Sequence, residues 1–184
     1  MQGREILIGV TGGIAAYKAA MLASRLVQLG AGVSVVMTKS ATELVRPRTF
    51  EAISARTVLT EMFDETRRHP HIELSRAAQL LCIAPVTANF LGKMANGIAD
   101  DLLSTIYLSF RGTVLAAPAM NCEMWEKKAV QRNVEQLKSD GVFFVGPESG
   151  RLSCGEIGIG RMAEPNKIIE AILALPEFEK KLRT

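Results

Sequence analysis

The sequence has few residues that could form a disulfide framework or a metal site. Its three cysteines, Cys82, Cys122 and Cys154, are an odd number with no CxxC pair, which predicts neither disulfides nor structural zinc. The two histidines, His69 and His71, have no cluster of carboxylates or thiols beside them. We therefore expect no metal, and a reducing compartment as the natural setting for these thiols.

Long apolar runs and runs of one charge are also absent. No apolar stretch approaches the ~20 residues of a membrane-spanning helix. The polar start Met-Gln-Gly-Arg-Glu, followed by a short apolar run, is typical of a strand and not of a signal peptide. The net charge of +3 is spread along the chain and does not indicate nucleic-acid binding. These features predict a soluble cytoplasmic domain with no membrane and no nucleic-acid partner.

What the sequence does have is a regular alternation of short β-branched runs and helical patterns. Strands are expected at 5–10, 33–37, 80–84, 113–117 and 142–145. Helices are expected at 14–29, 87–96, 101–109, 123–139 and 165–175, with weaker helical segments between 38 and 53 and a helix that begins near His71. This order predicts one α/β domain over residues 1–184, a doubly wound Rossmann-like (flavodoxin-like) fold with a parallel sheet.

Small, polar or proline-bounded segments follow four of the expected strands. They are residues 11–13, 38–40, 85–89 and 118–121. Ligands of doubly wound sheets bind beyond the carboxyl ends of the strands. The coincidence of four such segments predicts a ligand site at that edge.

The first two of these segments indicate what kind of ligand binds. Gly12 and Gly13 open a helix, where free N–H groups can receive a phosphate, but the sequence has no G-x-G-x-x-G or Walker motif. The second strand ends at Thr38-Lys39-Ser40 and not at the acidic residue that holds an NAD ribose. A mononucleotide such as FMN is favoured over NAD, and a tight turn capped by hydroxyls is the alternative.

The later segments allow two interpretations each. Thr87, Ala88 and Asn89 could cap a helix or meet the edge of a flavin ring. Asn121 could cap a helix or orient a substrate carboxylate, because its amide both donates and accepts. Cys82 lies within an apolar strand and is expected in the core.

A glycine-rich segment spans residues 150–162. It contains Gly150, Gly155, Gly158 and Gly160, with Cys154 between Arg151 and Arg161. We expect it to be too flexible for a helix or a strand. It is interpreted as a flap that closes over an anionic ligand and presents a thiol; a plain surface loop is the alternative.

Five motifs in order resemble the homo-oligomeric flavin-containing cysteine decarboxylases. They are Gly-Val-Thr-Gly-Gly-Ile-Ala-Ala-Tyr-Lys (9–18), His-Ile-Glu-Leu (71–74), Pro-Val-Thr-Ala-Asn-Phe (85–90), Pro-Ala-Met-Asn-Cys-Glu-Met-Trp (118–125) and the segment 150–162. The resemblance covers nearly the whole chain.

The resemblance implies a role for particular residues. His71 would be the catalytic base and Cys154 a proton donor; Asn121 and Met124 would bind the substrate carboxylate region, and Arg76 its phosphate. FMN contacts would fall on Gly12, Gly13, Ile14, Thr38, Ser40, Thr87, Ala88, Asn89, Phe90 and Ala117. Phe90 stands where the family often has a small residue, so the sequence departs from the family pattern at this expected flavin contact.

The resemblance also implies a reaction and partners. Members with a flap cysteine decarboxylate 4'-phosphopantothenoylcysteine to 4'-phosphopantetheine in coenzyme A biosynthesis, through thioaldehyde and enethiol stages. FMN is the cofactor, and it sits between protomers of a homotrimer or a multiple of trimers. A phosphopantothenoylcysteine synthetase domain or protein is a further expected partner. The alternatives are an oxidative decarboxylase of a peptide's C-terminal cysteine and an FMN-binding regulatory subunit.

Overall fold

A computed structural model describes residues 1–63, 69–152 and 155–178 of the chain. Five parallel strands form the central sheet, in the order β2-β1-β3-β4-β5. Their bounds are β1 Glu5–Val10, β2 Gly32–Met37, β3 Leu80–Val86, β4 Thr113–Pro118 and β5 Phe143–Phe144. This is the predicted doubly wound, flavodoxin-like arrangement.

The strand order places a topological switch point between β1 and β3. From β1 the chain moves outward to β2, then returns to β3 on the other side and continues to β4 and β5. The crossovers therefore diverge at the carboxyl ends of β1 and β3. In open α/β sheets such a divergence is where ligands bind.

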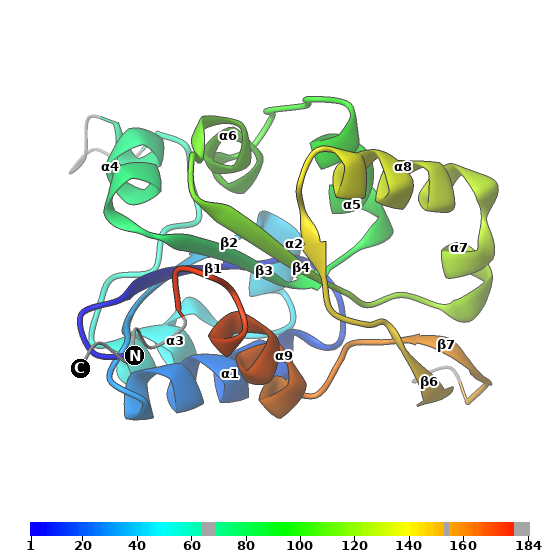
Figure 1. Ribbon diagram of the computed structural model, residues 1–184, viewed down its shortest axis with the longest axis horizontal. Coiled ribbons are helices and arrows are strands. Elements are labelled where there is room, and N and C mark those ends of the chain that lie inside the picture. The colour runs from blue at the N-terminus through cyan, green and yellow to red at the C-terminus, as the bar shows by residue number, and fades with distance from the viewer. Residues whose placement is uncertain (64–68, 153–154, 179–184) are drawn as a thin grey trace.

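Helices cover both faces of the sheet (Figure 1). On one face lie α1 Ala16–Gln28, α3 Pro47–Ser54 and α9 Pro165–Leu173; on the other lie α4 Pro70–Ala77, α5 Ala88–Ala95, α6 Leu102–Ser109 and α8 Lys128–Ser139. Two short helices, α2 Lys39–Thr42 and α7 Cys122–Glu126, follow strand ends. No helix in the described ranges is both long and apolar enough to cross a membrane.

The two faces of the sheet bury separate hydrophobic clusters, because successive strand residues point to opposite faces. In β1, Ile6 and Ile8 pack in the cluster with α1 and α9, whereas Leu7 packs in the cluster with α5, α6 and α8. Cys82 in β3 is fully buried in the first cluster, as predicted.

The segment 150–162 differs from the sequence prediction. We expected no strand there, but β6 Glu148–Arg151 and β7 Ile157–Arg161 pair as an antiparallel hairpin. Its glycines allow close packing: a Cβ at Gly158 would lie 2.7 Å from Cys122 Cβ, and one at Gly160 would overlap the Met120 carbonyl oxygen. The hairpin projects beyond the sheet beside α7 (Figure 1).

The single helix expected over 123–139 is also wrong. The chain forms α7 and α8 in its place, because Lys127 adopts extended backbone between them. The other expected helices form within a few residues of their predicted bounds, and α4 begins at Pro70, one residue before His71.

Candidate active site

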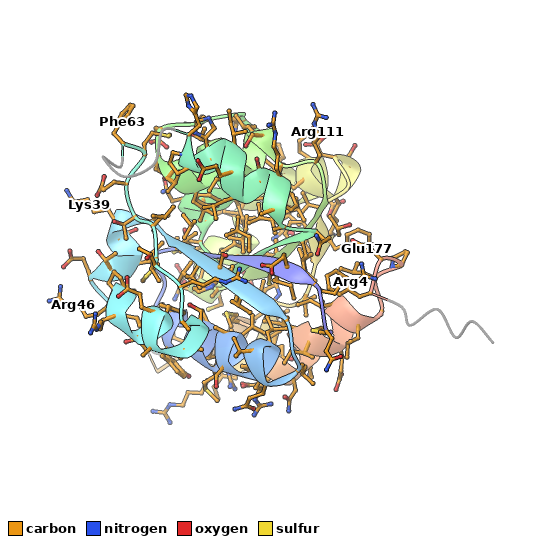
Figure 2. The ribbon with its side chains drawn as sticks, turned by 90° about the vertical axis from the view of Figure 1, so that its left-hand side faces the viewer. Arg4, Lys39, Arg46, Phe63, Arg111 and Glu177 are labelled. Atoms are coloured by element: carbon orange, nitrogen blue, oxygen red, sulfur yellow. The ribbon has the colours of Figure 1, made fainter. Side chains whose placement is uncertain are left out.

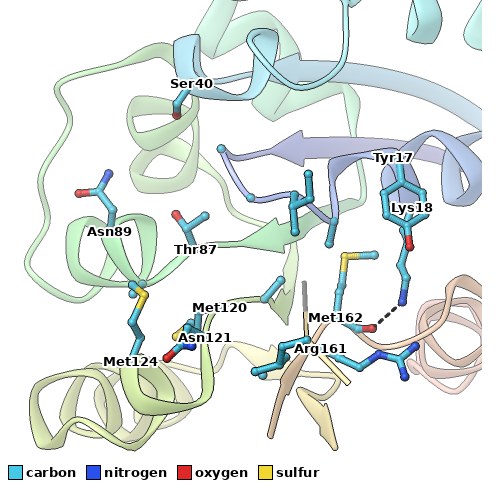
Figure 3. Close-up of a pocket in the computed structure, with 18 of the residues that line it drawn as sticks. Tyr17, Lys18, Ser40, Thr87, Asn89, Met120, Asn121, Met124, Arg161 and Met162 are labelled. Atoms are coloured by element: carbon cyan, nitrogen blue, oxygen red, sulfur yellow. Dashed lines mark hydrogen bonds between the residues drawn. The ribbon is translucent and has the colours of Figure 1, made fainter. Parts of the chain in front are cut away.

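A cavity of about 820 Å³ lies at the carboxyl ends of β1, β3 and β4 and is bounded by the β6–β7 hairpin. Its size falls within the ~300–1,000 Å³ usual for ligand pockets. Figure 3 shows Ser40 on one side and Asn121 and Met124 on the other. The described lining residues are Gly12, Gly13, Ile14, Ala15, Tyr17, Lys18, Ser40, Thr87, Ala88, Asn89, Ala119, Met120, Asn121, Met124, Arg151, Leu152, Gly160, Arg161 and Met162.

The glycine turn after β1 is held close to its neighbours. A Cβ at Gly12 would lie 2.5 Å from Ser40 Cβ, so only glycine fits there without a shift. Thr11 fixes the turn from the other side: its hydroxyl donates to the Pro85 carbonyl at 2.8 Å and accepts from the Thr87 N–H at 3.1 Å. The sequence reasoning did not single out Thr11, although its place between a strand and Gly12 was a usable signal.

Two of the hydroxyl residues at the strand ends serve as helix caps. Thr38 accepts from the Ala41 N–H at 3.4 Å and lies 3.2 Å from the Ser40 hydroxyl. Thr87 accepts from the Phe90 N–H at 3.3 Å. Thr87 also lines the cavity, so its capping and ligand interpretations are compatible, whereas Ser40 lines the cavity from within α2 and caps no helix among the bonds described.

Three of the predicted cofactor residues do not line the main cavity. Thr38 and Phe90 line a second hollow that shares Ser40, Thr87 and Asn89 with the first. Phe90 and Ala117 are buried in the two hydrophobic clusters. Neither side chain is accessible, since Phe90 is 1% and Ala117 0% exposed.

Asn121 presents its two amide ends in different directions. Its Oδ1 accepts from the Glu123 N–H at 2.8 Å, which caps α7. Its Nδ2 donates to Glu156 Oε2 at 2.9 Å. The capping interpretation is therefore correct for Oδ1, while Nδ2 faces the hairpin. Met124, 46% exposed, lines the same side of the cavity.

Cations dominate the described cavity lining: Lys18, Arg151 and Arg161 are its only charged residues. Lys18 is 7% exposed. Its Nζ donates to the Met162 carbonyl at 3.1 Å and to Glu164 Oε1 at 2.8 Å (Figure 3 shows the first of these bonds). Arg161 lies 3.2 Å from the same carboxylate oxygen.

These contacts act on the protonation of Glu164. The hydrogen bond from Lys18 lowers the pKa of Glu164, against the opposing effect of burial. Sequence reasoning missed Lys18 and Glu164 as a pair. One signal was available. Lys18 lies between Ala15 and Leu22 on the apolar face of the predicted helix, where a buried lysine needs a polar partner.

Two predicted residues, His71 and Arg76, do not reach this cavity. Both belong to α4, which lies at the opposite end of the molecule's long axis from α7 and the hairpin (Figure 1). Among the described residues, His71 Nδ1 is buried without a hydrogen-bond partner. Arg76 lines a separate hollow together with Arg111. The predicted Cys154 lies outside the described residues.

Comparisons with known proteins agree with this architecture. A bifunctional coenzyme A biosynthesis protein, CoaBC, of Bacillus subtilis is 46% identical over 172 residues, which are 92% of this chain and 42% of the relative. The chain thus spans less than half the length of the curated relatives that it matches first.

Solved structures match over nearly their full length. A PPC decarboxylase mutant complexed with pantothenoylaminoethenethiol is 31% identical with a TM-score of 0.81, covering 92% of this chain and 96% of that one. The FMN-dependent cysteine decarboxylase SpaF is 33% identical with a TM-score of 0.78, covering 92% and 98%. The profile of the Flavoprotein family matches residues 1–176. The resemblance seen in the sequence is confirmed, and the chain belongs to the Flavoprotein family.

Proposed function

We propose that this chain is an FMN-dependent decarboxylase that converts 4'-phosphopantothenoylcysteine (PPC) to 4'-phosphopantetheine. The observation that carries the proposal is the cavity at the β1/β3 switch point, which combines a glycine turn, an asparagine amide and three cations. The likeness to a PPC decarboxylase and to a coenzyme A biosynthesis protein supports this substrate.

The residues at the strand ends fit FMN. Gly12 and Gly13 leave backbone room that a side chain at Gly12 would fill, and Ser40 adds a hydroxyl donor for the phosphate end. Thr87, Ala88 and Asn89 would meet the ring system. When bound, FMN would supply a two-electron oxidant for the substrate thiol and return those electrons later.

The opposite side of the cavity suits the substrate. The Asn121 Nδ2 group would donate to the carboxylate that is lost as carbon dioxide, and Met124 would pack beside it. Holding that carboxylate in one orientation is how a binding group speeds a unimolecular loss. Lys18, Arg151 and Arg161 give the cavity the positive charge that a phosphorylated acid requires.

Acid–base steps are assigned to His71 and Cys154. His71 would take the proton of the substrate thiol on a ring nitrogen, and its buried Nδ1 has no competing partner in the described part of the chain. Cys154 would protonate carbon after decarboxylation. On the near side of it in the chain, Leu152 lines the cavity, and its N–H donates to the Glu156 carbonyl at 2.8 Å.

We further propose that a second copy of the chain supplies His71 and Arg76. One chain keeps α4 away from the cavity (Figure 1), so a site with both His71 and Asn121 needs two subunits. Two large side chains at the cavity rim are exposed, Ile14 at 62% and Tyr17 at 56%. This supports the proposal, because a neighbouring subunit would cover them. A trimer, or a multiple of trimers, in the cytoplasm is the assembly we expect.

The exposed edge of the molecule carries a further apolar side chain. Figure 2 shows Phe63 projecting outward near the start of α4, and its exposure is 94%. It precedes the residues that lie outside the described ranges. A subunit contact there would explain so exposed a phenylalanine.

The test is anaerobic incubation of the purified chain with PPC, followed by mass spectrometry and flavin absorption. We expect 4'-phosphopantetheine, carbon dioxide and a flavin that ends oxidised. Release of the enethiol as the final product would favour the alternative, an oxidative decarboxylase of a peptide's C-terminal cysteine. Unchanged PPC with FMN bound would contradict the proposed substrate.

Cofactor assignment has its own test. Gly12→Ala should lower FMN retention, measured from the ratio of flavin to protein absorbance, because the added Cβ meets Ser40. Gly92→Ala, whose Cβ would make only ordinary contact at 3.6 Å, is the matched control. Equal FMN content in both variants would remove Gly12 from the FMN site.

A further inference from the structure

One carboxylate of this chain already occupies the amide that we assign to the substrate. Glu156 Oε2 accepts from Asn121 Nδ2 at 2.9 Å, a length typical of a good hydrogen bond. Glu156 directly precedes β7, and Asn121 lies in the segment after β4. The contact therefore joins the hairpin to the substrate side of the cavity.

The geometry of Asn121 leaves one end of its amide for a carboxylate. Oδ1 is committed to the α7 cap through the Glu123 N–H. Only Nδ2 can donate. Glu156 presents to that group the same functional group that the substrate would bring.

A second contact fixes the location of the Glu156 carboxylate. The Cys122 thiol donates to the same Oε2 at 3.6 Å. Burial, followed by the hydrogen bond and negative charge of Glu156, raises the pKa of Cys122. The backbone of Glu156 is held separately, because its carbonyl accepts from the Leu152 N–H at 2.8 Å.

We propose that Glu156 is a placeholder for the substrate carboxylate and thereby a specificity-determining residue of the site. Asn121 Nδ2 carries two N–H donors, but two carboxylates held at the same nitrogen repel each other, so a substrate carboxylate and Glu156 compete for this group. A substrate acid that binds Asn121 would displace the Glu156 carboxylate from it. This inference rests on the proposed function, which assigns the substrate carboxylate to Asn121.

The placeholder lowers affinity for the substrate, so removing its charge should lower KM. In Glu156→Gln we expect KM for PPC to fall about 3- to 10-fold, the range that corresponds to one ordinary, solvent-exposed hydrogen bond. We expect kcat to stay within about threefold, because the carboxylate has left when the substrate is bound. Glu123→Gln removes a charge at a nearby position of α7 and should leave KM unchanged.

A second readout does not depend on turnover. Glu156→Gln should speed alkylation of Cys122 by iodoacetamide at neutral pH, because the thiolate forms more readily without the adjacent carboxylate. Trypsin places Cys122 in the peptide 112–127 and Cys154 in the peptide 152–161, so mass spectrometry separates them. Glu123→Gln should alkylate at the rate of the natural chain.

The possible results distinguish a failure of the Glu156 proposal from a failure of the proposed function. Normal turnover with a KM in Glu156→Gln that is unchanged or higher would overturn the placeholder and leave the proposed function standing. No turnover of PPC by the natural chain would refute the proposed function and the placeholder with it. Unchanged Cys122 alkylation would refute the Glu156 contact itself.

Discussion

At the scale of single residues, Gly160 has a packing role that its neighbours enforce. It is buried where β7 crosses the segment after β4, and its carbonyl accepts from the Met120 N–H at 2.9 Å. A Cβ there would overlap the Met120 carbonyl oxygen, a backbone atom with little room to move. The absence of a side chain therefore sets how closely the hairpin approaches Asn121.

We predict that Gly160→Ala destabilises the protein by about 1–3 kcal/mol, the usual cost of overpacking. Gly92→Ala, inside α5, should instead stabilise it by roughly 0.5–1 kcal/mol through helix propensity. Urea denaturation followed by circular dichroism measures both. A Gly160→Ala midpoint equal to that of the natural chain would contradict the close approach.

At the scale of elements, Lys18 anchors the hairpin to α1. The contact connects residues 146 positions apart in the chain, and it fixes the end of β7 near the glycine turn. Since Glu164 is 46% exposed in its side chain, solvent weakens the pair. Its effect should be local to the hairpin.

Lys18→Met should therefore open the hairpin more than it unfolds the domain. We expect tryptic cleavage after Arg151 or Arg161 to become several-fold faster, with a loss of only about 1 kcal/mol in unfolding free energy. Lys138→Met, which removes an exposed pair with Glu135 on α8, is the control and should leave cleavage unchanged. Restored protection in Lys18→Arg would show that the cation is what matters.

Acid should weaken the same anchor. The folded pKa of Glu164 is lowered below its usual 4.5 by Lys18. The ionised group stabilises the fold above that value, and the contribution is lost as pH falls through the folded pKa. Between about pH 6 and pH 3 the natural chain should lose more stability than Glu164→Gln. Stability is measured by thermal unfolding at each pH. If the stability of the natural chain and that of Glu164→Gln fall in parallel with pH, the proposed effect of the Lys18–Glu164 pair is wrong.

Most strands and helices were predictable from the sequence. In a parallel α/β fold, each of them has a clear hydrophobic pattern within its own short segment. The two failures have tertiary causes. The apolar face of 123–139 continues through Val130 and Val134, so nothing in the pattern marks the break at Lys127. The glycines of β7 permit a strand there because Gly158 and Gly160, without side chains, can pack against Cys122 and Met120. These contacts are distant in sequence, so the local pattern of glycines does not predict them.

At the scale of the whole molecule, the sequence predicted only those parts of the site that follow the carboxyl ends of the strands. Gly12, Ser40 and Thr87 follow strands that must converge at one edge, so their meeting is a consequence of topology. The Lys18–Glu164 pair depends on contacts between distant segments. The motif around His71 was recognised from resemblance, but the chain places it far from Asn121.

The separation of His71 from Asn121 predicts complementation between subunits. His71→Asn and Asn121→Asp chains should each be inactive alone and should regain activity when co-expressed with different tags and purified as mixed oligomers. In a closed ring of three that contains both kinds of chain, one interface pairs an intact His71 with an intact Asn121, so about a third of the sites should work. Two differently tagged His71→Asn chains are the control. Mixed oligomers that remain inactive would show that both residues act within one chain, which would require α4 to move across the molecule.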